Sequence, residues 1–184
     1  MIIRKRNWER FYTTRTVNIF ESIFGENDDI SISRNDIFNE PYKEKKVLET
    51  IMWGYPKGWP QRTMRSVTNN LDSIISSLSS GNIDCILETK NRIPYLGWST
   101  LTKLLYFFDL KINGYQCLIL DRVVRRATQV YCEFDGTNMT RLDFNTYLSY
   151  IQILKKQADN LKVNPDQIEL YLFNEGRNNN ERLP

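Results

Sequence analysis

Apolar residues that recur every three or four positions constrain the fold of this chain most strongly. Between residues 61 and 80 they form one stripe, made of Met64, Val67, Leu71, Ile74, Ile75 and Leu78. This spacing places apolar side chains on one face of an α-helix. Because similar spacing recurs in several other segments, we expect a mostly α-helical protein.

The periodic segments and the turn-forming residues between them define the expected elements. The length of 184 residues favours a single domain covering residues 1–184. Residues 1–33 have mixed periodicity and remain unassigned, and residues 178–180 begin a polar tail. Helices are predicted over residues 36–53, 61–80, 83–90, 98–109, 122–131, 141–161 and 165–173, with turns over residues 57–60, 93–97 and 113–114.

The absence of one residue type and the scarcity of another limit the chemistry. The chain has no histidine, which excludes Ser-His-Asp and Cys-His catalysis and histidine-ligated zinc. Cys85, Cys117 and Cys132 are an odd number without a close pair, so a disulfide framework, a thiolate zinc site and an iron–sulfur cluster are unsupported. We expect buried free thiols, no metal and no cofactor.

Charge is distributed unevenly, although the net charge is only +3. Residues 90–126 carry seven basic against two acidic side chains, and residues 1–15 carry five against one. Residues 21–44 are acidic instead. Such a layout suits a protein that binds a polyanion through one face. No apolar run approaches the length of a membrane helix and the N-terminus lacks a signal-peptide pattern, so we expect a soluble cytoplasmic protein. We also expect it to be a monomer.

The most informative segment runs from Ile93 to Arg126. A short turn ending at Gly97 joins two predicted helices, and backbone N–H groups at such a helix N-terminus can bind a phosphate. Further along, the apolar run 117–120 leads to Asp121, which is placed to cap the next helix. The basic pair Arg125 and Arg126 follows one turn later.

These residues resemble the helix-hairpin-helix DNA glycosylase superfamily, most closely its 8-oxoguanine-glycosylase-like branch. The hairpin is Ile93-Pro94-Tyr95-Leu96-Gly97, and the acidic element runs from Leu118 to Arg126. The resemblance implies a helical glycosylase-like fold, with the helix-hairpin-helix region at about residues 83–132. It also implies a DNA N-glycosylase, with or without AP-lyase activity, that acts on duplex DNA and associates with the nucleoid when bound.

Two positions depart from the family pattern. Tyr95 stands where the family usually has the first glycine of the hairpin, and Ser99 stands where bifunctional members have a lysine. Lys103 lies one helical turn beyond Ser99 and is the candidate amine. Asp121 would stabilise positive charge on the sugar, and Lys103 would attack it. The residues expected to bind DNA are Tyr95, Leu96, Gly97, Ser99, Arg122, Arg125, Arg126, Arg62 and Arg65.

A flipped-out base needs an apolar or aromatic pocket. We expect it to be lined by Trp53, Tyr55, Trp98, Tyr106 and Phe107, with Trp59 nearby in the same loop as Tyr55. Plainer interpretations stay open, because Asp121 could be only a helix cap, Lys103 a solvated lysine, and Tyr106 and Phe107 core residues. The substrate could be an oxidised guanine in repair or a bulky modified pyrimidine of phage DNA in defence. The alternatives are a non-catalytic DNA-binding module and a helical protein-interaction domain.

Overall fold

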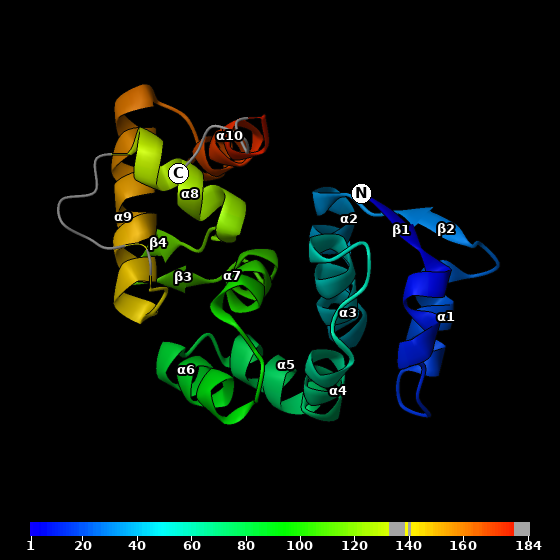
Figure 1. Cartoon of the computed structure of the whole chain (residues 1–184). Coiled ribbons are helices and arrows are strands. Elements are labelled where there is room, and N and C mark those ends of the chain that lie inside the picture. The colour runs from blue at the N-terminus through cyan, green and yellow to red at the C-terminus, as the bar shows by residue number, and fades with distance from the viewer. Residues whose placement is uncertain (133–138, 140, 179–184) are drawn as a thin grey trace. The chain divides into compact units, whose positions relative to one another are not determined.

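A computed structural model describes residues 1–132, 139 and 141–178, and it is mostly α-helical, which confirms the expected fold class (Figure 1). The chain divides into two compact units, residues 1–100 and residues 101–184. The boundary falls inside helix α7 (Trp98–Phe107), and each unit is described by itself. A single domain over residues 1–184 stays a prediction.

The first unit begins with the segment that the sequence pattern left unassigned. Its two short strands pair antiparallel, with Ile3 opposite Ile30. Between the strands in the sequence, Trp8 and Phe20 are fully buried. The elements up to residue 33 are β1 (Ile2–Arg4), two 3₁₀ turns (Lys5–Asn7 and Glu9–Phe11), α1 (Val17–Phe24) and β2 (Asp29–Ser31).

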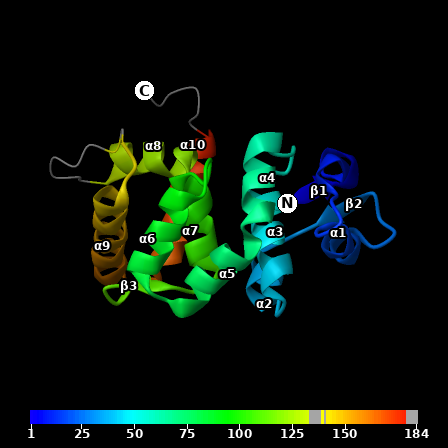
Figure 2. The same ribbon diagram turned by 90° about the horizontal axis from the view of Figure 1, so that it is seen from below.

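Five helices complete this unit, and two of the predicted helices prove to be interrupted. They are α2 (Arg34–Asn39), α3 (Lys43–Gly54), α4 (Gln61–Asn69), α5 (Leu71–Ser80) and α6 (Ile83–Arg92). Helix α3 packs against α1, α2 and α5, and α5 packs against α6, an arrangement that can be followed in Figure 2.

The prediction of one helix over residues 36–53 was wrong because of Pro41. Proline disfavours helical geometry in the residue before it, and Glu40 is accordingly extended, with φ −68° and ψ 114°. The prediction of one helix over residues 61–80 was wrong at Asn70, which has φ −115° and ψ 20°. Its side-chain amide donates to the Ser66 carbonyl oxygen at 2.8 Å, and such a local bond competes with helix continuation.

Over its described residues, the second unit combines a small hairpin with three further helices. Asn113 and Gly114 have φ of 52° and 82°, the left-handed geometry of a tight two-residue turn, so the turn predicted here is confirmed. The elements after α7 are β3 (Lys111–Ile112), β4 (Tyr115–Gln116), α8 (Arg122–Tyr131), α9 (Phe144–Leu161) and α10 (Pro165–Asn178).

Helix ends in this unit differ modestly from the sequence prediction. Helix α7 ends at Phe107 rather than 109, and α9 begins at Phe144 because Asp143 caps it. Helix α10 continues five residues past the predicted end at Phe173. Of the predicted polar tail, Asn178 is helical, whereas residues 179 and 180 lie outside the described residues.

Helices α8 and α10 approach each other closely, and a glycine makes this possible. A Cβ atom added to Gly176 of α10 would lie 2.8 Å from both the Cγ1 atom and the carbonyl oxygen of Val123. Val123 lies in the first turn of α8, two residues after the capping residue Asp121. The contact therefore supports the end of α8 that carries the candidate carboxylate.

The three cysteines are free, and two of them are buried. Cys117 and Cys132 fit the expectation of buried thiols, but Cys85 lies exposed in the first turn of α6, so that part of the prediction was wrong. No helix of the described residues is long and apolar enough to cross a membrane.

Candidate active site

The chain that leads to Asp121 is buried and lies outside any strand. Residues 117–120 are at most 1% exposed, so their backbone polar groups need partners from the protein. Side-chain hydroxyls supply several of them. Leu118 donates its N–H to the Tyr147 hydroxyl at 3.0 Å, and that hydroxyl donates to the Leu118 carbonyl oxygen at 2.9 Å.

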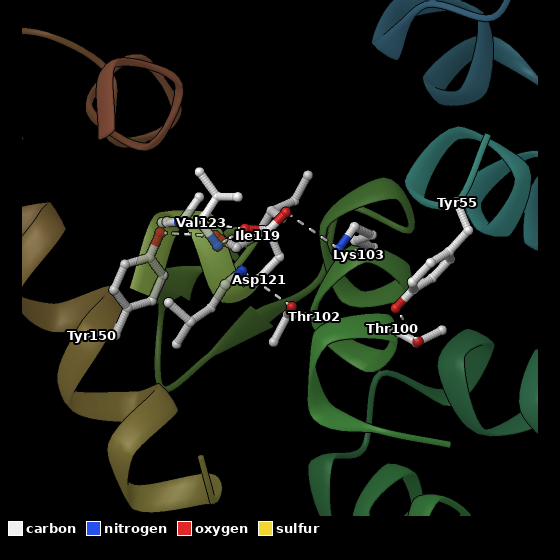
Figure 3. A network of polar contacts seen from close by, with 10 residues as sticks. Tyr55, Thr100, Thr102, Lys103, Ile119, Asp121, Val123 and Tyr150 are labelled. Atoms are coloured by element: carbon white, nitrogen blue, oxygen red, sulfur yellow. Dashed lines mark hydrogen bonds and ion pairs between the residues drawn. The ribbon is translucent and has the colours of Figure 1, made fainter. Parts of the chain in front are cut away.

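Two more hydroxyls hold the residues nearest to Asp121. The Tyr150 hydroxyl donates to the Ile119 carbonyl oxygen at 2.9 Å, and Thr102 Oγ1 accepts the Leu120 N–H at 3.1 Å (Figure 3). Burial is the largest of the effects that raise the pKa of Tyr147 and Tyr150 well above 10.0. Both phenols therefore stay protonated and keep their donor hydrogens.

The two carboxylate oxygens of Asp121 have different partners. Oδ1 accepts the N–H groups of Val123 at 2.9 Å and Val124 at 3.0 Å, which confirms the predicted N-cap of α8. Oδ2 lies 3.7 Å from Lys103 Nζ (Figure 3). The carboxylate thus caps a helix and also faces an amine.

Lys103 is buried, contrary to the alternative of a solvated helical lysine. Its side chain is 4% exposed, and that of Asp121 is 19% exposed. A buried amine needs compensation for its lost hydration, which a nearby carboxylate provides. At 3.7 Å the two groups form an ion pair but are farther apart than a normal hydrogen bond. The arrangement can move a proton between nitrogen and oxygen after a small approach.

The hairpin before α7 shows how the chain replaces the expected glycine. Tyr95 adopts φ 65°, the left-handed conformation that glycine takes most readily. Ile93 and Leu96 are buried, whereas Pro94, Tyr95 and Gly97 are exposed. The backbone therefore makes the tight turn despite the departure from the family pattern, and Tyr95 presents its ring to solvent.

The arginines predicted to bind DNA lie on two helices. Arg122 is exposed and Arg125 and Arg126 are half-buried on α8, while Arg62 and Arg65 are exposed on α4 of the first unit. Their contacts with DNA stay predictions, as do those of Tyr95, Leu96, Gly97 and Ser99.

Three of the aromatic residues predicted to line a base pocket lie in the first unit. Tyr55 stacks on Trp59 with ring centroids 5.1 Å apart, and its hydroxyl lies 3.1 Å from Thr100 Oγ1 (Figure 3). The Arg34 guanidinium lies 5.5 Å from the ring of Trp53. Trp98 is likewise half-buried, with Lys90 Nζ at 5.4 Å from its ring.

Tyr106 and Phe107 belong to the interior of the second unit. They are 3% and 1% exposed and contact each other edge to face, with centroids 5.1 Å apart. The structure thus brings Tyr106 together with Phe107, and separately Tyr55 with Trp59. That these rings line a base pocket stays a prediction.

Sequence reasoning missed the hydroxyls that hold residues 118–120. Tyr147 and Tyr150 are three apart on the apolar face of α9, which a pattern of spacing treats as ordinary core. It also missed Glu169, which is fully buried and whose negative charge contributes to the raised pKa of both tyrosines. A glutamate inside an otherwise apolar helical stripe is the signal that could have marked it.

The residues that the structure describes contain no group of three or more acidic or cysteine side chains placed to hold a metal ion. The site therefore consists of a carboxylate, an amine and the hydroxyls around them.

Comparison with known proteins adds a family. The family model described as "Putative 8-oxoguanine DNA glycosylase OGG-like protein" matches residues 2–173, almost the whole chain. No curated protein and no solved structure matches the chain.

Proposed function

Since the chain belongs to the family of 8-oxoguanine-DNA-glycosylase-like (OGG-like) proteins, we propose that it removes a damaged or modified base from duplex DNA by cleaving the N-glycosidic bond. The observation that carries the proposal is the pair of buried Lys103 and partly exposed Asp121, whose Nζ and Oδ2 atoms are 3.7 Å apart. A family match alone supports only a DNA glycosylase type of function, and this pair supplies groups suited to the reaction.

Asp121 acts on the sugar. As the base leaves with the bonding electrons, the deoxyribose gains oxocarbenium character, and a nearby carboxylate stabilises that positive charge. Oδ1 is occupied by the helix cap, so Oδ2 is the oxygen that meets the sugar or a water molecule.

Lys103 gives the enzyme its lyase branch. A neutral amine attacks C1′ of the deoxyribose, the N-glycosidic bond breaks, and the departing base takes up a proton. The attached nitrogen, now positively charged, gives one proton to Asp121, which passes it to the ring oxygen O4′ as the C1′–O4′ bond breaks and a protonated Schiff base forms.

Duplex DNA is the partner, and the base is flipped out before reaction. In this proposal the hairpin around Tyr95 and the arginines of α8 bind the phosphates, since backbone N–H groups and guanidinium groups suit that role. We propose an oxidised guanine in repair or a bulky modified pyrimidine in defence against phage as the substrate, and a monomer in the cytoplasm as the working form.

A base-release assay on a panel of modified duplexes tests this function. The decisive variant is Asp121→Asn, because asparagine caps a helix as well as aspartate but carries no charge. We expect excision to be lost while folding and DNA binding persist. Asp143→Asn is the matched control, since Asp143 caps α9 in the same way by accepting the Thr146 N–H at 2.9 Å.

The covalent step has its own assay. Borohydride reduces a Schiff base to a stable protein–DNA adduct, which we expect with the wild-type chain and not with Lys103→Ala. DNA binding without base release from any duplex of the panel would instead identify a non-catalytic binding module.

A further inference from the structure

One hydrogen bond joins the neighbours of the two charged residues. Thr102 precedes Lys103 on α7, and Leu120 precedes Asp121 before α8. The Leu120 N–H donates to Thr102 Oγ1 at 3.1 Å, and both residues are fully buried. This bond ties the backbone that carries the carboxylate to the helix that carries the amine.

We propose that Thr102 is a positioning residue for base removal, setting the separation of Lys103 and Asp121 through its hydrogen bond with Leu120. The inference rests on the proposed function, because it concerns the same site. The Cys117 N–H donates to the Leu110 carbonyl oxygen at 2.9 Å, but residues 118–120 lie outside any strand, so no ladder of backbone hydrogen bonds continues along them. A side-chain acceptor on α7 therefore does what a neighbouring strand would otherwise do.

The two tyrosines of α9 hold the same segment farther from Asp121. Tyr150 bonds Ile119, two residues before Asp121, and Tyr147 makes two bonds to Leu118, three residues before it. A purely structural role predicts that Tyr147→Phe, which removes two buried hydrogen bonds, is the most damaging change to stability and to activity alike. A positioning role predicts a different order.

The experiment compares Thr102→Val, Thr102→Ser, Tyr150→Phe and Tyr147→Phe. Valine keeps the shape of threonine but cannot accept the Leu120 N–H, whereas serine keeps the acceptor. Single-turnover base release and DNA affinity are measured separately for each folded variant. We expect Thr102→Val to slow release between about tenfold and a hundredfold with unchanged affinity, because small misplacements of reacting groups are that costly.

The expected order separates positioning from stability. Thr102→Ser should retain nearly wild-type release, and the loss should be largest for Thr102→Val, smaller for Tyr150→Phe and smallest for Tyr147→Phe. Losses that instead follow the losses in unfolding free energy, with Tyr147→Phe the worst, would overturn the inference. Wild-type rates in folded Thr102→Val would do the same.

A measurement without substrate keeps this test independent of the proposed function. The amide resonances of Val123 and Val124 report on Asp121, because both N–H groups donate to its Oδ1. We expect Thr102→Val to shift these resonances and Thr102→Ser to leave them in place; unmoved resonances in Thr102→Val would refute the inference. A wild-type chain that releases no base defeats the proposed function, whatever the resonances show.

Discussion

Asp121 caps α8 with Oδ1 and faces Lys103 with Oδ2, and substitutions can separate the cap from the charge. Asp121→Ala removes both the helix cap and the charge, whereas Asp121→Asn removes only the charge. Loss of an N-cap costs about 1 kcal/mol. Both variants also remove the carboxylate that compensates buried Lys103, so in urea denaturation we expect Asp121→Ala to lower the unfolding free energy by about 1 kcal/mol more than Asp121→Asn does. Equal losses in the two variants would show that the cap contributes little.

Tyr95 holds a backbone conformation that suits glycine. The left-handed region costs a residue with a side chain about 1–2 kcal/mol, and glycine gives back about 0.5–1 kcal/mol through its greater unfolded-state freedom. Because Tyr95 is 61% exposed, removing its ring loses little packing. We therefore expect Tyr95→Gly to leave the unfolding free energy unchanged or raise it by up to about 1 kcal/mol. Tyr95→Val, which is β-branched, should lower it, and a strong loss in Tyr95→Gly would contradict this account.

Glu49 of α3 makes stability depend on pH. Burial raises its pKa from 4.5 to about 7, although Lys45, with Nζ 3.8 Å from Oε1, opposes the shift. The folded chain therefore binds more protons than the unfolded chain between these values. The contribution of protonated Glu49 to stability is therefore present below pH 4.5 and is lost as the pH rises to about 7.

Replacement of Glu49 by glutamine should remove this dependence. We expect the thermal midpoint of the wild-type chain to decline across this window and that of Glu49→Gln to decline less. Glu44→Gln is the control, because Glu44 is exposed on the same helix. A decline that is the same in Glu49→Gln and in wild type would locate the pH dependence elsewhere.

At the scale of elements, the contact of α10 with α8 depends on Gly176. An alanine there would bring its Cβ within 2.8 Å of the Val123 backbone oxygen, which cannot rotate away. We expect Gly176→Ala to lower the unfolding free energy by about 1–3 kcal/mol, as overpacked positions do. Glu175→Ala, at the preceding half-buried position, provides the comparison. Stability equal to wild type would mean that the helices can separate without cost.

The helical fold class and most helix positions follow from apolar spacing, but the breaks between α2 and α3 and between α4 and α5 do not. A stripe of apolar residues continues past Asn70 because both helices bury the same side, so spacing alone does not detect the bend. Pro41 is a clear local signal for a helix break, and the prediction of one helix over residues 36–53 gave it too little weight.

The site was partly predictable for a different reason. The hairpin and the apolar run before Asp121 are sequence motifs, so Lys103 and Asp121 could be nominated from them. The hydroxyls of Thr102, Tyr147 and Tyr150 bind backbone atoms, and backbone atoms are the same for every sequence. Hydrogen bonds between side-chain hydroxyls and backbone atoms therefore cannot be predicted from a pattern of residue types.

At the scale of the whole molecule, the uneven charge bears on DNA binding. Each phosphate contact that a cation makes adds about 0.9 to the slope of log affinity against log salt. We expect Arg122→Gln to reduce this slope by about one unit, measured by fluorescence anisotropy on an unmodified duplex. Lys156→Gln, an exposed change on α9, should leave the slope unchanged. An unaltered slope in Arg122→Gln would remove Arg122 from the DNA interface.

The distribution of thiols has a practical consequence. Burial raises the pKa of Cys117 to about 12 and also raises the pKa of Cys132, while Cys85 lies exposed on α6, the helix before the hairpin. A maleimide dye at neutral pH should therefore mark Cys85 alone in the native chain. The unaltered protein already offers a single attachment point for fluorescence observation of individual DNA encounters, without removal of any cysteine.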